Sequence, residues 1–141
     1  MGRIIETIKI NNFIDEQLSE RGLLTPDNIR NIEVEALADS GATTLCLQRH
    51  CINQLGLPFL KEVNVRTGNG SVRRRVYSGA HLFLLGRDDI FSVMEVPDDC
   101  LNLIGQIPLE ELDFVLDLPG RRIIPNPEHG GELTMEIYVV F

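Results

Sequence analysis

The pattern of apolar and polar residues predicts a chain made mostly of β-strands. Residues 4–10 are rich in β-branched side chains, and apolar residues alternate with polar ones over residues 32–38. Both features favour strands, because successive side chains of a strand point to opposite faces of its sheet. The same reasoning predicts further strands over residues 61–66, 72–77, 80–85, 90–96, 113–118, 121–124 and, at the end of the chain, 133–141, with a short apolar run at 101–104.

Helices are expected to be few and short. Apolar residues recur at every fourth position from Leu47 to Leu55, which predicts a helix over residues 47–55. A second helix is expected over residues 108–112, because a proline at the first helical position lacks only an N–H that would have no partner there. The predicted fold class is therefore all-β, or mainly β, with one or two short helices.

The connecting segments are predicted from their glycine, proline and polar residues. Residues 15–28 are polar and are expected to form a long loop. Pro119 and Gly120 are expected at the centre of a type II turn, whose third residue needs a positive φ. Residues 126–141 are interpreted as a C-terminal extension of a single domain over residues 1–125. The extension is either a strand at a dimer interface or a segment removed by self-cleavage, and both interpretations stay open.

Composition and charge exclude several function classes. The chain has 141 residues, of which 43% are hydrophobic and 24% charged, which is the balance of one globular domain. Its net charge of -8 argues against a nucleic-acid binder with a basic surface. No apolar run approaches the ~18 residues of a membrane span, and Arg3, Glu6 and Lys9 interrupt the region where a secretory signal would be apolar. We therefore expect a cytoplasmic protein that contacts neither nucleic acid nor membrane.

Cysteine usage indicates reduced thiols. The chain has three cysteines, Cys46, Cys51 and Cys100, an odd number that does not suit a disulfide framework. A zinc site could be built from Cys46, His50 and Cys51 if a helix carried them, but there is no CxxC pair and the other histidines are distant in sequence. We expect small buried thiols and no metal.

The basic cluster of the chain is Arg73, Arg74 and Arg75. In a strand, Arg74 points away from the face that its two neighbours share, so the cluster does not form one patch. A solvated face of a hairpin is the favoured interpretation, and a preference for acidic residues in a substrate is the alternative.

The densest chemical signal follows the strand at residues 32–38. Asp39 comes directly after this strand, and Ser40 and Gly41 come next. Glycine lets the backbone bend and lets N–H groups approach the carboxylate, while the serine hydroxyl can bond a neighbouring backbone group. Asp-Ser-Gly is also a common surface turn. Apolar residues on both sides, with Leu45 opening the second run, favour a packed turn instead.

In this motif the chain resembles the retropepsin-like aspartic proteases, which are the retroviral proteases and their cellular relatives. Residues 36–42, Ala-Leu-Ala-Asp-Ser-Gly-Ala, look like the family's apolar-apolar-Asp-Ser/Thr-Gly-Ala loop. The glycine-rich turn at residues 67–71 falls where the family has its flap, and residues 103–105, Leu-Ile-Gly, resemble its second signature. The helix and the strand-turn-strand over residues 114–124 then follow as in bacterial members and in the protease domain of ubiquitin-shuttle proteins.

The resemblance implies a small closed β structure that acts as a homodimer on peptide or protein substrates without a cofactor. It implies that Asp39 is the catalytic carboxylate and that Ser40, Gly41 and Ala42 support its loop. The implied flap, which closes on the substrate, consists of Thr67, Gly68, Asn69, Gly70 and Ser71, and the implied packing support consists of Leu103, Ile104 and Gly105.

The number of active-site motifs independently requires a dimer. Aspartic protease chemistry needs two carboxylates that share one proton, so that one polarises the scissile carbonyl while the other takes a proton from water. The chain has a single Asp-Ser/Thr-Gly motif and is too short for a two-lobed enzyme. Asp39 of one subunit is therefore expected to meet Asp39 of the other across a two-fold axis.

Two functions are consistent with this sequence. The favoured one is an aspartic endopeptidase that hydrolyses peptide bonds with an Asp39 dyad and an activated water. The alternative is a catalytically silent module of the same fold that binds extended peptides by strand addition or acts only in dimerisation. Retention of Asp39, Ser40 and Gly41 together favours the enzyme, because a binding module has no chemical need for that aspartate.

The identity of residue 42, an alanine, leads to a prediction of how the activity depends on pH. Ala42 has no hydroxyl that could donate a hydrogen bond to the ionised carboxylates, so activity is expected to extend toward neutral pH. In Ala42→Ser the added donor stabilises the charged form, and the pH–rate profile should move toward acid. Cleavage rates measured from pH 4 to 8 check this, and an unmoved profile contradicts it.

Overall fold

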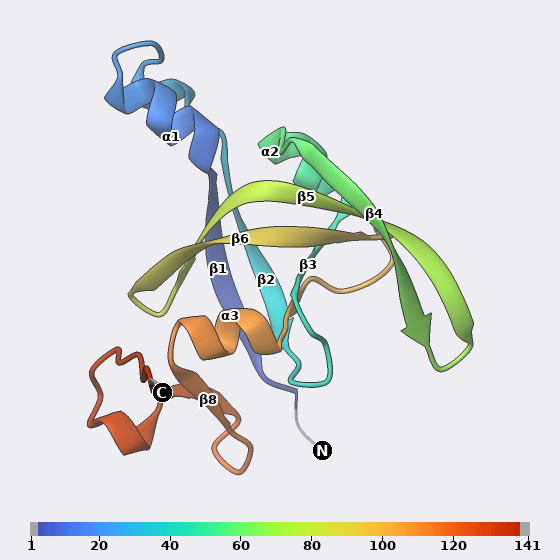
Figure 1. Ribbon diagram of the computed structural model, residues 1–141, viewed down its shortest axis with the longest axis vertical. Helices are drawn as coiled ribbons and strands as arrows, with labels where there is room; N and C mark the ends of the chain where they lie inside the picture. Colours follow the sequence, from blue (N-terminus) through green and yellow to red (C-terminus); the bar gives the residue numbers. More distant parts are fainter. Residues whose placement is uncertain (1–2, 139–141) are drawn as a thin grey trace.

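The computed structural model describes residues 3–138, and they form a sheet that closes on itself (Figure 1). The strand order is β1-β2-β7-β3-β6-β5-β4, and β1 also pairs with β5, which closes the sheet. The strands of this sheet are β1 (Ile5–Asn12), β2 (Asn31–Ala38), β3 (Leu45–Gln48), β4 (Phe59–Thr67), β5 (Gly70–Leu84), β6 (Arg87–Val96) and β7 (Leu103–Ile104). The mainly β class with a small closed sheet is confirmed.

Short helices and a second, two-stranded sheet complete the chain. The helices are α1 (Phe13–Glu20), α2 (Arg49–Leu55) and α3 (Gln106–Glu111), with 3₁₀ turns at Pro26–Asn28 and Pro127–His129. The small sheet pairs β8 (Phe114–Asp117) with β9 (Arg122–Pro125). None of the helices within residues 3–138 is both long and apolar enough to cross a bilayer.

The core lies inside the closed sheet, where the predicted alternation places apolar side chains. In β1, Ile8 and Ile10 are fully buried while Lys9 between them is exposed. Strands β3, β5, β6 and β7 add the fully buried side chains of Leu45, Leu47, Leu82, Leu84, Val93 and Ile104. Burying such a side chain contributes about 1.5–3 kcal/mol, so these alternating strands supply much of the driving force for closing the sheet.

One long strand replaces two predicted ones. Residues 72–77 and 80–85 were expected as separate strands, but both belong to β5. The register with β6 shifts between Tyr77 and Ala80, where Gly79 has a φ of 78°. A glycine in the left-handed region accommodates a bulge inside a strand, so the predicted break is a local irregularity.

The segment expected as a loop over residues 15–28 begins as a helix, so that prediction was wrong for its first part. The Asn12 side chain caps α1 by accepting a hydrogen bond from the Asp15 N–H at 3.0 Å. The buried Asp15 carboxylate accepts from Arg30 Nε at 2.8 Å and from Arg30 Nη2 at 3.0 Å, and this pairing lowers the pKa of Asp15. The segment is polar because α1 projects from the body of the molecule (Figure 1).

The predicted helices exist but begin elsewhere. Leu47 belongs to β3 and is fully buried there, so α2 begins at Arg49 rather than at residue 47. A four-residue spacing does not distinguish a helix from a short buried strand that leads into one. α2 ends as expected, since Gly56 caps it with a φ of 62°. The helix predicted from Pro108 begins two residues earlier, at Gln106.

Two expectations near the C-terminus were also wrong. The turn between β8 and β9 is not type II, because Arg121, at φ 52°, has the positive φ that was assigned to Gly120. Residues 133–138 of the expected last strand form no strand, and residues 139–141 lie outside the described part of the chain. The extension contacts the body through His129, whose Nδ1 lies 2.7 Å from Asp113 Oδ2, and this contact raises the pKa of His129.

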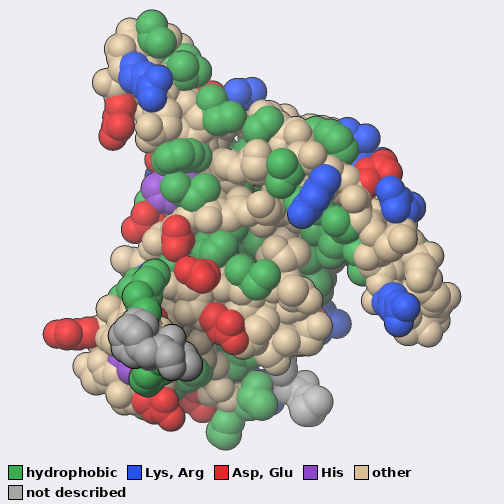
Figure 2. All heavy atoms as spheres, in the orientation of Figure 1, with side chains coloured by type: hydrophobic (Ala, Val, Ile, Leu, Met, Phe, Trp, Pro, Cys, Tyr) green, Lys and Arg blue, Asp and Glu red, His purple; other side chains and the backbone are tan. Residues whose placement is uncertain are grey.

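A hairpin formed by β4 and the first half of β5 extends away from the closed sheet (Figure 1). Its turn consists of Gly68 and Asn69, and Gly70 completes it with a φ of 121°. Lys and Arg side chains gather over this hairpin, at the right of Figure 2, whereas acidic side chains gather on the lower left. We call residues 59–77 the β4–β5 hairpin.

The segment that enters and follows β7 holds the strand ends together. The buried side chain of Asn102 accepts a hydrogen bond from the Gln48 N–H at 2.9 Å and donates one to the Glu35 carbonyl at 3.1 Å. Three residues later, Gly105 lies so close to Thr44 that a Cβ would come within 2.7 Å of the Thr44 nitrogen. The structure therefore needs an amide side chain at position 102 and a glycine, which has no side chain, at position 105.

Gly105→Ala should destabilise the fold by about 2–3 kcal/mol, because the added methyl group meets backbone atoms that cannot move aside cheaply. Gly68→Ala is the matched control. Gly68 has a negative φ and no atom within 4 Å of an added Cβ, so its effect should stay within about 0.5 kcal/mol. Urea unfolding measures both, and equal effects would contradict the close approach at Gly105.

Asn102→Leu should lower the free energy of unfolding by about 2–4 kcal/mol. The substitution keeps the volume but leaves the Gln48 N–H and the Glu35 carbonyl without their partner. Asn53→Leu, at an exposed position of α2, is the control for the same chemical change and should be nearly neutral. Thermal and urea unfolding of both variants check this, and a neutral Asn102→Leu would refute the bridging role.

Candidate functional site

Asp39 lies at the end of β2, where backbone hydrogen bonds hold it on both sides. Its N–H donates to the Ile104 carbonyl at 3.0 Å, and its own carbonyl accepts from the Ala42 N–H at 3.1 Å. Its carboxylate Oδ1 accepts from the Gly41 N–H at 2.9 Å. The carboxylate is partly exposed. A hydrogen-bonded yet accessible carboxylate is suited to acid–base chemistry on a bound ligand.

The residues after Asp39 form a tight turn around this carboxylate. A Cβ at Gly41 would stand 3.1 Å from Asp39 Oδ1, which is closer than most side chains come, so glycine keeps the N–H beside the carboxylate. Ser40 is exposed at the tip of the turn. Within residues 3–138, the hydrogen bonds that fix the turn are donated by backbone N–H groups rather than by the Ser40 hydroxyl.

The second predicted signature lies against this turn. The Gln106 N–H donates to the Ala42 carbonyl at 2.8 Å, and the Ile107 N–H donates to the Thr43 carbonyl at 2.8 Å. Gly105 makes these bonds possible, because it brings the start of α3 against Thr44. The structure therefore brings residues 103–105 and the Asp39 turn together, although more than sixty residues separate them in sequence.

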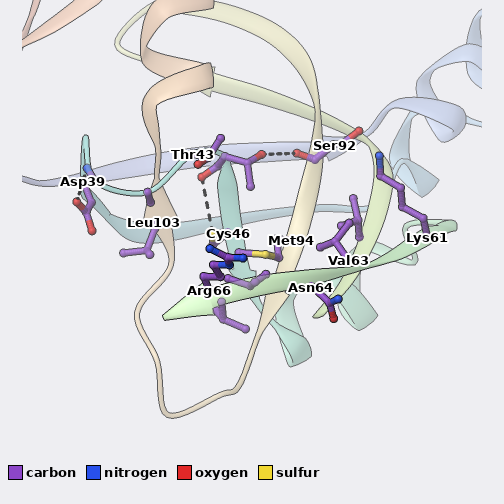
Figure 3. Close-up of a pocket in the computed structure, with 16 residues that line it drawn as sticks. Asp39, Thr43, Cys46, Lys61, Val63, Asn64, Arg66, Ser92, Met94 and Leu103 are labelled. Atoms are coloured by element: carbon purple, nitrogen blue, oxygen red, sulfur yellow. Dashed lines mark hydrogen bonds between the residues drawn. The ribbon is translucent and has the colours of Figure 1, made fainter. Parts of the chain in front are cut away.

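Asp39 opens into a cavity of about 710 Å³ between the turn, β6 and the β4–β5 hairpin (Figure 3). Gly41, Ala42 and Thr43 lie at the same end as Asp39. The apolar part of the lining consists of Val63, Val65, Val76, Met94, Val96 and Leu103. Of the described residues that line this cavity, Asp39 alone carries a carboxyl group. An apolar cleft with few polar groups is the usual form of a ligand site.

The hairpin strand, rather than the hairpin tip, lines this cavity. Arg66 is the last lining residue of β4, and Thr67 to Ser71 at the tip are exposed and do not line it. The tip has its own bonds, since Thr67 Oγ1 donates to the Gly70 carbonyl at 2.9 Å and accepts from the Asn69 N–H at 3.2 Å. The role of these residues in closing on a substrate stays a prediction.

Several lining residues were not identified from the sequence. Lys61, Asn64 and Arg66 come from β4, and Ser92 and Met94 come from β6. The sequence predicted a strand over residues 61–66. It does not say which face of the hairpin meets the cavity, because strand pairing decides that.

Cys46, in β3, also lines the cavity. Its thiol is buried and lies 3.7 Å from the Thr44 carbonyl. Burial, together with the nearby charge of Asp39, raises the pKa of Cys46 to about 11. The thiol is therefore protonated near neutral pH and is unsuited to act as a nucleophile.

The zinc ligands considered in the sequence do not converge. His50 Nδ1 lies 2.8 Å from Asp98 Oδ1, and the hydrogen bond from the His50 N–H is the main reason why the pKa of Asp98 is lowered. His50 Nε2 lies 3.6 Å from Cys51 Sγ. Across residues 3–138, no three His, Cys, Asp or Glu side chains are grouped so that they could hold a metal ion.

Comparison with known families supports the resemblance found in the sequence. The family described as "gag-polyprotein putative aspartyl protease" matches residues 27–101, which are 75 of the 141 residues. The matched region contains Asp39 and the β4–β5 hairpin and ends just before β7. No curated protein matches the chain. Because the family match covers more than half of the sequence, the chain belongs to the retropepsin-like aspartyl proteases.

Proposed function

We propose that the protein is a homodimeric aspartic endopeptidase in which Asp39 of each subunit supplies one carboxyl group of the catalytic dyad. The observation that carries this proposal is the position of Asp39: a partly exposed, hydrogen-bonded carboxylate at one end of a large, mainly apolar cavity. Family membership supports peptide hydrolysis as the class of reaction.

The need for a second carboxylate supports the dimer. Among the described residues around the cavity, none but Asp39 is acidic, so one chain offers half of the required pair. A two-fold axis beside Asp39 would bring the same turn of a second copy to this place. Two carboxylates at contact distance do not both ionise readily, so one of them keeps a proton at working pH.

This pair accounts for hydrolysis without a cofactor. The protonated carboxyl donates a hydrogen bond to the scissile carbonyl oxygen and polarises the carbonyl. The ionised carboxylate takes a proton from water as the water oxygen attacks the carbonyl carbon. The tetrahedral intermediate then collapses, the C–N bond breaks, and the leaving nitrogen takes a proton from the dyad. The Gly41 N–H stabilises and orients the carboxylate on which these transfers occur.

Two surfaces would hold the peptide. The apolar side chains of the cavity would take apolar side chains of the substrate. Within residues 3–138, β4 pairs with β5 on one side only, and its other edge is available to pair with an extended peptide. The peptide would then lie between the Asp39 turn and the hairpin.

Asp39→Asn should reduce peptide cleavage by about a thousandfold or more, since the amide can neither accept nor supply the proton. Asp27→Asn is the matched control: Asp27 is exposed in the segment between α1 and β2, and its removal should leave the rate unchanged. The assay is cleavage of a peptide library from pH 4 to 8. Equal rates for wild type and Asp39→Asn would refute the mechanism.

Mixing the two proteins tests whether the dyad is shared between subunits. With the wild-type concentration constant, an excess of Asp39→Asn should suppress activity as subunits exchange, because a mixed dimer holds only one aspartate. An excess of Asp27→Asn should not suppress activity, because its mixed dimers keep both copies of Asp39. Sedimentation equilibrium establishes the oligomeric state in parallel. Activity that does not respond to excess Asp39→Asn would mean that each chain acts alone.

A further inference from the structure

Two cations without acidic partners border the cavity. Lys61 and Arg66, both on β4, line it, and neither forms an ion pair within the described part of the chain. Two other cations of the hairpin are engaged: Arg73 pairs with Glu62 at 3.2 Å, and Arg75 stacks on the Phe59 ring at 4.2 Å. Arg74 also has no acidic partner among the described residues, but it does not line the cavity, so Lys61 and Arg66 are the unpaired cations of the hairpin that border the cavity.

This charge contrasts with that of the whole chain. The β4–β5 hairpin carries five basic side chains and one acidic side chain, a net charge of +4, whereas the chain as a whole carries -8. In Figure 2 several Lys and Arg side chains lie over the hairpin at the right, with one acidic group among them, whereas most acidic side chains of that face lie at the lower left. Such a local excess attracts ligands of opposite charge and disfavours cationic ones.

Because Lys61 and Arg66 lie on an edge strand, they can distinguish peptides by the side chains that a bound peptide places opposite them. β4 is the last strand in the order of the sheet, so its free edge can pair with an added strand. In such a pair, directly opposite side chains interact, and opposite charges stabilise the pairing. Lys61 and Arg66 are five residues apart along the strand, a distance of about 17 Å at ~3.4 Å per residue, and their side chains leave opposite faces of β4. The peptide side chains directly opposite them would also be five positions apart and on opposite faces. A peptide of about eight residues would reach both.

We infer that the cavity selects extended peptides with an apolar centre and acidic side chains on both flanks, five positions apart, and that Lys61 and Arg66 determine this preference. The inference rests on the proposed function, because it takes the Asp39 cavity as the peptide site. The apolar centre would occupy the lining from Val63 to Leu103, and the flanking carboxylates would meet the two cations.

The test uses octapeptides whose four middle residues are randomised over Val, Leu, Met and Phe. The second and seventh positions carry Glu, Gln or Lys. Binding is measured on the full-length Asp39→Asn protein by fluorescence anisotropy, and cleavage is measured on wild type. Each Glu should improve binding over Gln by about two- to fivefold, as cross-strand ion pairs do, and each Lys should weaken it.

Charge reversal identifies the residues responsible. In Lys61→Glu and in Arg66→Glu, the preference at one of the two peptide positions should change from Glu to Lys, and the double variant should reverse both. Arg21→Glu makes the same change of charge at an exposed position at the end of α1 and should leave the preference unchanged. A preference that moves equally with Arg21→Glu reflects net charge alone and overturns the inference.

The two readouts separate this inference from the proposed function. Cleavage without any preference for acidic flanks overturns the inference and leaves the proposed function standing. Binding that prefers acidic flanks and reverses with Lys61→Glu, without cleavage at any pH from 4 to 8, supports the inference and contradicts the enzyme. Peptides that are neither bound nor cleaved contradict both.

Discussion

The contact between the Asp39 turn and the segment after β7 is the constraint on which the rest of the site depends. Three backbone hydrogen bonds join them: Asp39 donates to Ile104, and the first residues of α3 donate to Ala42 and Thr43. Gly105 permits the approach, because any side chain there would enter the backbone at Thr44. These bonds give the backbone groups of the turn their partners and place the Asp39 backbone, and the Gly41 N–H then holds the Asp39 carboxylate.

The strands around this contact explain why the carboxylate faces a cavity rather than open solvent. β7 lies between β2, which ends directly before Asp39, and β3, which begins after the turn. The buried amide of Asn102 ties β2 to the end of β3 across the same gap. The hairpin then extends from the closed sheet through the long strand β5 and supplies a second wall. The closed sheet therefore positions the carboxylate, and an extended hairpin faces it.

The distribution of charged residues also differs between the hairpin and the rest of the molecule. Lys61 and Arg66 on the hairpin wall of the cavity have no acidic partner within residues 3–138, while α1 and the C-terminal extension are attached through carboxylates, Asp15 for the helix and Asp113 for the extension. The pKa values of both carboxyl groups are lowered, because Arg30 and His129 stabilise their ionised forms. These two carboxylates thus serve attachment, whereas Lys61 and Arg66 remain available to a ligand.

The sequence by itself determined the mainly β class, most strands and the chemical character of the Asp39 turn, because alternation and Asp-Ser-Gly are local patterns with local physical causes. It did not determine which residues line the cavity. The expected flap tip, Thr67 to Ser71, lies outside it, whereas Lys61 and Arg66 line it, and only the pairing of β4 with β5 decides this.

The helix α1 was missed because its stability comes from Asn12 and from Arg30, which lies beyond the predicted loop. The roles of Asn102 and Gly105 depend on partners more than fifty residues away, and such contacts exist only once the sheet has closed.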